Sequence, residues 1–229
     1  MSTIVKETQD VASPYTRHLG IFNPHKYPIS ATVIGCGAIG SFVAVGLAKM
    51  GVRKQTLFDF DKVEIENLPV QLHTKAWMGK PKVEATKAAI IDSCPETPTV
   101  ATFQKWDGQA LKTDVVVSAV DSLHVRKAIW ESVKYDSAVK ILVDARIGGQ
   151  FVKTYAVNPS DPKDIKLYDG TFPKGDMEGS ELPCTQRGVL DVSMFSASIL
   201  VNQIRRFVVS GEKEVYLAFN LSGPLRNIM

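Results

Sequence analysis

The chain has 229 residues, of which 45% are hydrophobic and 22% are charged, and its 27 lysines and arginines against 24 aspartates and glutamates give a formal net charge of +3 at pH 7. These values are typical of a globular protein and exclude a collagen-like, coiled-coil or disordered chain. The charge is small and mixed in sign, so no basic stripe indicates nucleic-acid binding. At about 150 residues per domain, the length suggests one large domain whose core needs no disulfide bonds.

The cysteines and the N-terminal residues favour a reduced, cytoplasmic setting. Cys36, Cys94 and Cys184 cannot all pair, and none stands in a C-x-x-C motif, so the local sequence encodes neither a disulfide framework nor a thiolate zinc site. The N-terminal residues lack the apolar core of a signal peptide, and no apolar run approaches the ~20 residues that a membrane helix needs. We expect a cytoplasmic protein without a membrane partner.

Strand-like and helix-like patterns alternate along most of the chain. Residues 1–30 are polar and interrupted by prolines, which predicts an N-terminal arm, and residues 31–229 are expected to form a single domain. The strands are expected at 32–34, 56–60, 99–103, 114–120, 141–143, 150–157 and 215–219, and the helices from the first glycine motif to Gly51, over 81–93, from Ser122 through Val133, and over 189–209.

This alternation predicts an α/β fold: a mainly parallel, Rossmann-like sheet with helices on both faces and antiparallel strands at its C-terminal end. The helix over 81–93 is expected to bury Val83, Ile90 and Ile91 on one face. Residues 158–183 break the pattern because they are rich in Pro, Gly, Asp and Lys. Connections of this length in compact domains are usually functional or disordered, so we expect a long loop there.

A glycine motif, Gly35-x-Gly37-x-x-Gly40, follows the first predicted strand and opens the first helix. Glycines let the backbone turn tightly and approach a phosphate, whose charge then meets the N–H groups of the helix N-terminus. Asp59 ends the second strand 24 residues after Gly35, where a carboxylate can accept hydrogen bonds from a ribose. The alternative is a glycine turn that serves packing alone. The combination of strand, helix and acidic residue favours a nucleotide site, without indicating which nucleotide.

The residues after Asp59 distinguish between classes of nucleotide-binding protein. Residues 59–71 read DFDKVEIENLPVQ, and they are followed by GKPK at 79–82 and by AVDS at 119–122 with Arg126. With these motifs in this order, the sequence resembles the ThiF, MoeB and HesA superfamily of adenylating enzymes, which is related to the ubiquitin-activating enzymes. The resemblance extends from about residue 15 to 207. It is more specific than the glycine motif alone because several ordered motifs carry it.

The resemblance implies a role for each matching position. Asp59 would hold the ribose, with Asp61 beside it in the nucleotide site, and Asn67, Gln71 and Lys82 would contact the triphosphate. Asp121 would serve the magnesium ion and the reaction centre. Arg17, in a Y-x-R element, would reach into the partner protomer's site. Taken singly, these residues have plainer interpretations. Asp121 could be a helix N-cap, Lys82 a solvated residue of a first helical turn, and Arg17 a surface cation.

The implied reaction suits these residue types. Attack of a carboxylate on the α-phosphorus of ATP expels pyrophosphate, and cations and Mg²⁺ must meet the charge that develops. The resemblance implies a homodimer that uses ATP and Mg²⁺ to adenylate the C-terminal carboxylate of a ubiquitin-like or sulfur-carrier protein, or of a peptide. Residues 158–183 would form the crossover loop that clamps the tail of this substrate.

Two departures from the family pattern affect the expected chemistry. Val70 replaces the arginine of the family's N-L-x-R-Q element, which contacts the leaving phosphates. Lys75 and Lys80 are the candidates to compensate. The two C-x-x-C pairs that bind structural zinc in many relatives are absent, so we expect no zinc.

Cys184 lies in an element that resembles the family's T-C-x-x-x-G-V, just before the last predicted helix. In some relatives the matching cysteine forms a covalent link with the activated protein, and in others it does no chemistry. A thiol near a helix start with Arg187 beside it can have a lowered pKa. The alternative is a buried, inert cysteine.

Two other functions stay open. The first is a nucleotide-binding relative without chemistry, which Val70 favours, and the second is an NAD-dependent oxidoreductase, which the glycine motif and Asp59 alone would allow. The four histidines, His18, His25, His73 and His124, lack metal-ligand spacing, so packing or solvated roles are expected for them.

Overall fold

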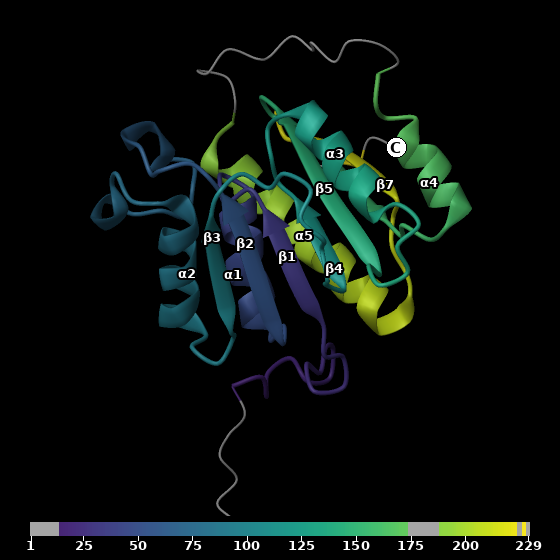
Figure 1. The fold of residues 1–229 in the computed structure, drawn as a ribbon, viewed down its shortest axis with the longest axis horizontal. Coiled ribbons are helices and arrows are strands. Elements are labelled where there is room, and N and C mark those ends of the chain that lie inside the picture. The colour runs from purple at the N-terminus through teal and green to yellow at the C-terminus, as the bar shows by residue number, and fades with distance from the viewer. Residues whose placement is uncertain (1–13, 174–187, 224–225, 228–229) are drawn as a thin grey trace, which may run out of the picture.

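The computed structural model describes residues 14–173, 188–223 and 226–227. The described strands form one eight-stranded sheet in the order β3-β2-β1-β4-β5-β6-β7-β8 (Figure 1). The strands are β1 (Ser30–Ile34), β2 (Lys54–Asp59), β3 (Thr99–Phe103), β4 (Val115–Ser118), β5 (Ile141–Gly148), β6 (Phe151–Val157), β7 (Tyr216–Asn220) and β8 (Arg226–Asn227). The helices are α1 (Gly40–Met50), α2 (Lys82–Ser93), α3 (Leu123–Val133), α4 (Pro162–Asp169) and α5 (Leu190–Ser210), with two 3-10 turns, η1 (Ile65–Asn67) and η2 (Lys75–Trp77).

The sheet is parallel from β3 through β5 and antiparallel from β5 through β8. This confirms the predicted Rossmann-like α/β fold with antiparallel strands towards the C-terminus. The central strands β1 and β4 are buried at every position because both faces of the sheet are covered, as in other parallel sheets. All four residues of β4 are buried, for example.

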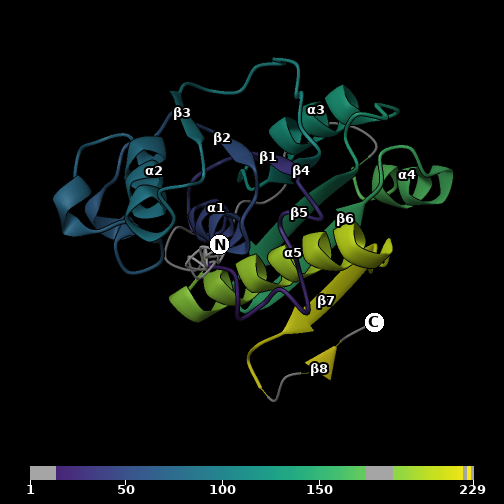
Figure 2. The same cartoon turned by 90° about the horizontal axis from the view of Figure 1, so that it is seen from below.

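Helices cover both faces of the sheet, and the strands alternate their side chains between them. Val115 and Val117 belong to the core that includes residues of α1, α2 and α5, whereas Val116 belongs to the core that includes residues of α3 and α4. Helices α1 and α5 pack side by side on the first face (Figure 2). No helix among the described residues has the length and apolar character needed to cross a lipid bilayer.

The described part of the predicted N-terminal arm, residues 14–29, consists of turns that pack against the domain. Phe22 and Ile29 are buried in the core of the first face. The hydroxyl of Tyr15 donates to Glu96 Oε1 at 2.9 Å, just before β3 begins. This segment therefore lies at the edge of the sheet where the parallel strands begin.

The helix ends follow the local signals in the sequence. Gly51 ends α1 in the left-handed conformation, with φ of 89°, which glycine adopts without strain. The Oγ of Ser122 accepts a hydrogen bond from the Val125 N–H at 3.4 Å and caps α3. Pro81 immediately precedes α2, which ends at Ser93 as predicted.

Helix α4 lies within the segment that we expected to be a long loop. The carboxylate of Asp161 accepts a hydrogen bond from the Lys163 N–H at 2.8 Å, and Pro162 occupies the first helical turn. Ile165 and Tyr168 on its inner side are buried. The expectation was wrong for residues 162–169 because Lys, Asp and Pro dominate their composition, although an Asp-Pro start and buried residues three apart are helix signals.

The buried face of α2 also differs from the prediction at one position. Val83 and Ile90 are fully buried, whereas Ile91 is 48% exposed. Adjacent residues are about 100° apart around a helix, so the position next to a buried residue often turns towards solvent.

The neighbouring isoleucines of α2 provide a matched test of this packing. Ile90→Ala should lower the free energy of unfolding by about 2–4 kcal/mol, because it leaves a cavity in the core. Ile91→Ala should lower it by less than about 1 kcal/mol. Urea unfolding of both variants measures the difference, and equal losses would contradict the packing of α2 described here.

Candidate functional site

Several of the predicted site residues meet at the carboxyl edge of the parallel strands. Strand β1 lies between β2 and β4 in the sheet. The connection after β1 leads to β2 on one side, and the connection after β4 leads to β5 on the other, so the two diverge between β1 and β4. Ligands of open α/β sheets bind at such a switch point. The glycine turn, residues 35–40, joins β1 to α1 there.

Two glycines of this turn are required by packing. Gly35 has φ of +94°, and a Cβ on it would lie 2.4 Å from the carbonyl oxygen of Ala119, just beyond β4. A Cβ on Gly40 would lie 1.8 Å from the carbonyl oxygen of Gly35. No side chain fits at either position, so these glycines let the turn close against the end of β4.

Gly37 is different, because the described residues leave open space beside it. Among them, a Cβ on Gly37 would have one neighbour within 4 Å, the Nε2 of Gln71 at 3.9 Å. Packing therefore explains Gly35 and Gly40 but not Gly37, and ligand binding stays a prediction for Gly37.

Asp59 at the end of β2 is fixed against the glycine turn. Its Oδ2 accepts a hydrogen bond from the Cys36 N–H at 2.6 Å, and its Oδ1 accepts one from the Asp61 N–H at 2.7 Å. Burial raises the pKa of Asp59 above its usual value, while the two backbone N–H groups and Lys82 act in the opposite direction. Each carboxylate oxygen keeps a further lone pair, so the group can also accept hydrogen bonds from ribose hydroxyls.

Lys82 brings a buried cation to the same place. It begins α2, its residue is 7% exposed, and its Nζ lies 2.9 Å from Asp61 Oδ2. Its charge acts on the pKa values of both Asp59 and His73, so the ammonium group lies near these side chains. A cation at a helix N-terminus is unfavourable unless an anion compensates it. Asp61, whose side chain is 49% exposed, now fills that role, and a phosphate could share it.

Asn67 and Gln71 lie in the turn-rich segment that follows. The Oδ1 of Asn67 accepts a hydrogen bond from the Glu64 N–H at 3.0 Å, and its backbone carbonyl accepts one from the Gln71 N–H at 2.9 Å. The Gln71 side chain faces the glycine turn at Gly37. The structure therefore brings Gln71 to the site, with Asn67 shaping the turn that carries it.

Asp121 is exposed and lies two residues after Ala119, which contacts the glycine turn. The backbone N–H of Ala119 donates to the carbonyl of Ile34 at the end of β1 at 2.8 Å. Ser122, not Asp121, is the N-cap of α3, so the plainer interpretation of Asp121 does not apply. Among the described residues, no group of three or more His, Cys, Asp and Glu side chains could hold a metal ion by itself.

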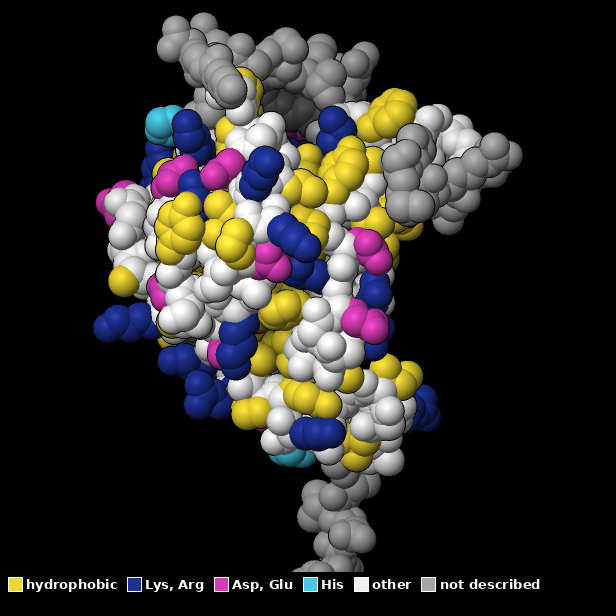
Figure 3. All heavy atoms as spheres, turned by 90° about the vertical axis from the view of Figure 1, so that its right-hand side faces the viewer, with side chains coloured by type: hydrophobic (Ala, Val, Ile, Leu, Met, Phe, Trp, Pro, Cys, Tyr) yellow, Lys and Arg dark blue, Asp and Glu magenta, His cyan; other side chains and the backbone are white. Residues whose placement is uncertain are grey.

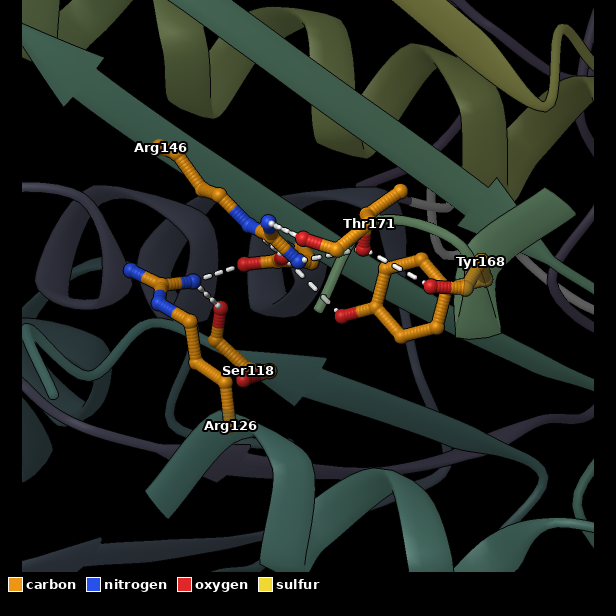
Figure 4. Close-up of polar contacts among 6 residues, drawn as sticks. Ser118, Arg126, Arg146, Tyr168 and Thr171 are labelled. Carbon is orange, nitrogen blue, oxygen red and sulfur yellow. Dashed lines mark hydrogen bonds and ion pairs between the residues drawn. The ribbon is translucent and has the colours of Figure 1, made fainter. Parts of the chain in front are cut away.

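A buried ionic network anchors the start of α3 beside Asp121 (Figure 4). No pattern in the sequence predicted this network. The fully buried carboxylate of Asp144 pairs with the guanidinium groups of Arg126 and Arg146, and the hydroxyl of Tyr168 donates to it at 2.9 Å. Arg126 also donates to the carbonyl of Ser118 at 3.1 Å. Burial lowers the pKa of Arg126 to about 10, so it remains charged at neutral pH.

Arg146 extends this network towards solvent. Its guanidinium carbon lies 4.7 Å from the ring centre of Tyr155 and 5.2 Å from that of Phe172, and its Nη2 donates to Thr171 Oγ1 at 3.1 Å. An open pocket of about 620 Å³ lies next to it, lined by Arg146, Ile147, Gly148, Phe151, Lys153, Tyr155 and Thr171. On the side of the molecule that carries α4 and the antiparallel strands, hydrophobic side chains are exposed beside Lys and Arg (Figure 3).

Among the described residues, one predicted site residue, Arg17, is not brought to this edge. Arg17 is exposed and follows Tyr15, whose ring packs at Gly51 near the opposite edge of the sheet. Its predicted role concerns a partner protomer. Cys184 lies outside the described residues, as do residues 174–183 of the predicted crossover loop.

His73 has a more specific position than the sequence predicted. It is 5% exposed, with its Nδ1 3.0 Å from Gln71 Oε1 and its Nε2 3.1 Å from Thr86 Oγ1. Burial, followed by the charge of Lys82, lowers the pKa of His73 to about 4. The available signal was its spacing, two residues after a predicted phosphate-contacting glutamine. For Asp144, the signal was an acidic residue directly after the apolar run of β5.

Comparison with known proteins identifies the family. The model of the ThiF family matches residues 28–223, which is most of the chain. The chain belongs to the ThiF family. This confirms the resemblance that the ordered motifs indicated.

The relatives of this chain include enzymes of different activities. The chain is 31% identical over 141 residues to ubiquitin-like modifier-activating enzyme 5 of Caenorhabditis elegans, covering 52% of this chain and 34% of that protein. It is 36% identical over 103 residues to the tRNA threonylcarbamoyladenosine dehydratase of Bacillus subtilis, covering 41% and 40% respectively. It is 30% identical over 167 residues to the molybdopterin-synthase adenylyltransferase of Haemophilus influenzae, covering 69% and 65%. The chain thus spans about a third to two thirds of the length of these relatives.

Solved structures support the same fold. The Escherichia coli MccB structure with ATP superposes with a TM-score of 0.75 at 14% identity, covering 95% of this chain and 71% of that chain. The MccB structure with AMPCPP and MccA gives a TM-score of 0.74 at 17% identity, with the same coverage. At these identities the likeness establishes the fold.

The glycine turn gives a test that separates packing from ligand binding. Gly40→Ala should lower the free energy of unfolding by about 3 kcal/mol or more, because its Cβ overlaps the carbonyl of Gly35. Gly37→Ala should change it by less than about 1 kcal/mol. Thermal and urea unfolding distinguish the two variants, and similar losses for both would contradict the two roles.

The buried histidine predicts a pH-dependent stability. The pKa of His73 is about 4 in the folded chain against 6.5 for an exposed histidine, so the unfolded chain binds the proton more tightly. The stability contribution is therefore present above pH 6.5 and lost as the pH falls towards 4, amounting to about 2 kcal/mol between pH 7 and pH 5. His73→Asn should remove this dependence. The measurement is the difference in unfolding free energy between wild type and variant at both pH values, which should shrink at pH 5.

Proposed function

We propose that this protein is an adenylyltransferase that uses Mg·ATP to activate the C-terminal carboxylate of a ubiquitin-like or sulfur-carrier protein, or of a peptide. The observation that carries the proposal is the convergence of four chemically distinct groups at the switch point: the open turn at Gly37, the carboxylate of Asp59, the buried ammonium of Lys82 and the amide of Gln71. Family membership and the similarity to a ubiquitin-like modifier-activating enzyme and a molybdopterin-synthase adenylyltransferase support this reaction.

The donor set fits a nucleoside triphosphate. Asp59 offers acceptors to a ribose, the glycine turn offers backbone N–H groups at the start of α1, and Lys82 with Gln71 offers a cation and a neutral donor to phosphate oxygens. The open space beside Gly37 is where a phosphate can approach the backbone closely. MccB structures contain ATP or AMPCPP on the same fold, which supports the choice of nucleotide.

A magnesium ion fits the same site through Asp121. Mg²⁺ in nucleotide sites is usually held by one or two carboxylates together with phosphate oxygens and water, so a single exposed carboxylate suffices. When bound, the ion would stabilise negative charge on the phosphate oxygens. The buried network behind α3 gives Asp121 a rigid support, because Arg126 ties this helix to Ser118 at the end of β4 and to Asp144 within β5.

The residues would act by positioning and charge stabilisation. An oxygen of the substrate carboxylate bonds to the α-phosphorus of ATP, the bond to the bridging oxygen breaks, and pyrophosphate leaves with the electron pair. Lys82 and Gln71 would stabilise charge on the phosphates as this bond breaks. The buried surroundings of Lys82 strengthen this attraction because little water competes for the cation.

The remaining parts of the proposal concern the partners. Arg17 is exposed near the edge opposite the site, so it would act on a second protomer of a homodimer and not on its own site. The pocket beside Arg146 and Lys153 lies near the end of β5, where the tail of an acyl substrate could reach the α-phosphate. Cys184 would then take up the acyl group as a thioester, with release of AMP.

A nucleotide-binding module without chemistry is the second candidate, and Val70 favours it. A valine cannot donate to the leaving phosphates as the family arginine does. Of the two lysines considered as substitutes, Lys80 has its Nζ 5.0 Å from the ring centre of Trp77, whose indole holds it by a cation–π contact. This contact does not prevent Lys80 from binding a phosphate, but it gives the lysine another partner.

Exchange of radiolabelled pyrophosphate into ATP tests the proposal. With Mg²⁺ and carrier proteins that end in Gly-Gly, wild type should catalyse exchange, and Asp121→Asn should lower the rate by about 100-fold or more, because the metal-binding carboxylate is lost. Glu131→Gln, an exposed change in the same helix α3, should leave the rate unchanged.

The alternatives predict different results. ATP binding without exchange for any carrier or peptide would favour the module without chemistry. Thermal stabilisation by NAD but not by Mg·ATP would favour the oxidoreductase. Equal exchange by wild type and Asp121→Asn would contradict the role of Asp121.

A further inference from the structure

His73 connects the predicted phosphate-contacting glutamine to the interior of the domain. Its Nδ1 lies 3.0 Å from Gln71 Oε1, and its Nε2 lies 3.1 Å from the hydroxyl of Thr86 in α2. Thr86 is fully buried and His73 nearly so. The imidazole thus has a partner on both sides, and the Gln71 amide reaches the glycine turn at Gly37.

The chemistry of these partners determines which nitrogen of His73 carries hydrogen. A neutral imidazole has one N–H donor and one acceptor nitrogen, and an amide oxygen can only accept. With Gln71 Oε1 as the neighbour of Nδ1, the hydrogen is on Nδ1, which donates to Gln71 Oε1. The Nε2 then accepts from the Thr86 hydroxyl. Burial keeps the ring neutral at pH 7, because the pKa of His73 is lowered to about 4.

Two contacts define the direction of the Gln71 amide, and the Nδ1–H tautomer of His73 stabilises it. With its oxygen held by His73, the NH₂ group of Gln71 is the part that faces the glycine turn, 3.9 Å from the position of a Cβ on Gly37. A rotation of the amide by 180° would instead present an oxygen acceptor to that space. A phosphate oxygen would be attracted by the first arrangement and repelled by the second.

We propose that His73 is a positioning residue that holds the Gln71 side chain with its NH₂ group towards the glycine turn, so that the site presents a donor to phosphate oxygens. The identity of the ligand rests on the proposed function. The orientation of the amide does not, because it follows from the contacts among Gln71, His73 and Thr86.

Two substitutions separate the two sides of the ring. The side-chain NH₂ of Asn reaches the place of Nδ1, so His73→Asn should keep the bond to Gln71 and leave the dissociation constant of ATP within about twofold of wild type. The longer side chain of Gln reaches the place of Nε2 and the Thr86 hydroxyl, so His73→Gln should raise that constant about tenfold, the effect of losing one hydrogen bond to a charged group. Gln71→Ala should raise it equally, and combining it with His73→Gln should add nothing.

A general structural role would give a different pattern. If His73 served only to fill space, Asn and Gln would weaken ATP binding in proportion to the loss of stability, and the double variant would be additive. Such additivity would overturn the proposal. Gln71→Glu gives a second test that leaves the histidine intact, because its carboxylate still accepts from Nδ1 but cannot donate. It should weaken ATP binding more than Gln71→Ala.

Long-range ¹H–¹⁵N spectra of the wild-type imidazole test the orientation without any ligand. Hydrogen on Nδ1 supports the proposal, and hydrogen on Nε2 overturns it, because the amide of Gln71 would then be reversed. If wild type binds ATP but fails to exchange pyrophosphate, the proposed function fails while the spectra and the dissociation constants still decide the role of His73. If wild type exchanges and His73→Gln binds ATP normally, the role of His73 fails alone.

Discussion

The contact between the glycine turn and the end of β4 is the constraint on which the site depends. At the switch point, the turn after β1 must pass under the carbonyl of Ala119, and no Cβ fits at Gly35 or Gly40. This closure fixes the start of α1, and with it the N–H groups that can meet an anion. It also fixes the distance between the turn and the loop that carries Asp121. The glycine turn and the loop that carries Asp121, the two halves of the proposed site, are therefore built on one backbone contact.

Around this contact the protein buries polar groups in pairs that leave donors facing outwards. Asp59 holds the backbone of the turn, Asp61 compensates Lys82, and His73 holds Gln71. Burial of a charged or polar group is costly unless it has a hydrogen-bond or ionic partner, so each of these groups is tolerated in the interior because its partner is present. Asp61 thus holds the ammonium group of Lys82, and His73 holds the amide of Gln71, without any ligand. Groups that are already held in place lose less entropy when a ligand binds.

Much of this architecture could be read from the sequence because short-range signals determine it. The β-branched runs, the cap at Gly51 and the start of α3 at Ser122 are set by local chemistry, and the structure agrees with each. Two features depended on distant partners. Helix α4 forms because Ile165 and Tyr168 find a buried surface beside β6, and Asp144 is tolerated in a buried strand because Arg126 reaches it from α3. Composition and spacing carry no record of such partners, and the same holds for His73, whose partner Thr86 lies 13 residues away in α2.

The separation between fold-building and ligand-facing residues bears on whether the chemistry is retained. Gly35, Gly40 and Asp144 are required by packing or charge pairing, so any stable member of this fold would need them or their equivalents. Gly37 and Asp121 have no such requirement, because the first faces open space and the second is an exposed residue that caps no helix. Stability does not explain their match to the adenylating family, whereas the proposed nucleotide and metal binding would. Val70 departs from the family pattern at a position that, by the resemblance, would contact the leaving phosphates and not the attacking carboxylate. Val70 therefore favours the module without chemistry, whereas Gly37 and Asp121 favour the enzyme.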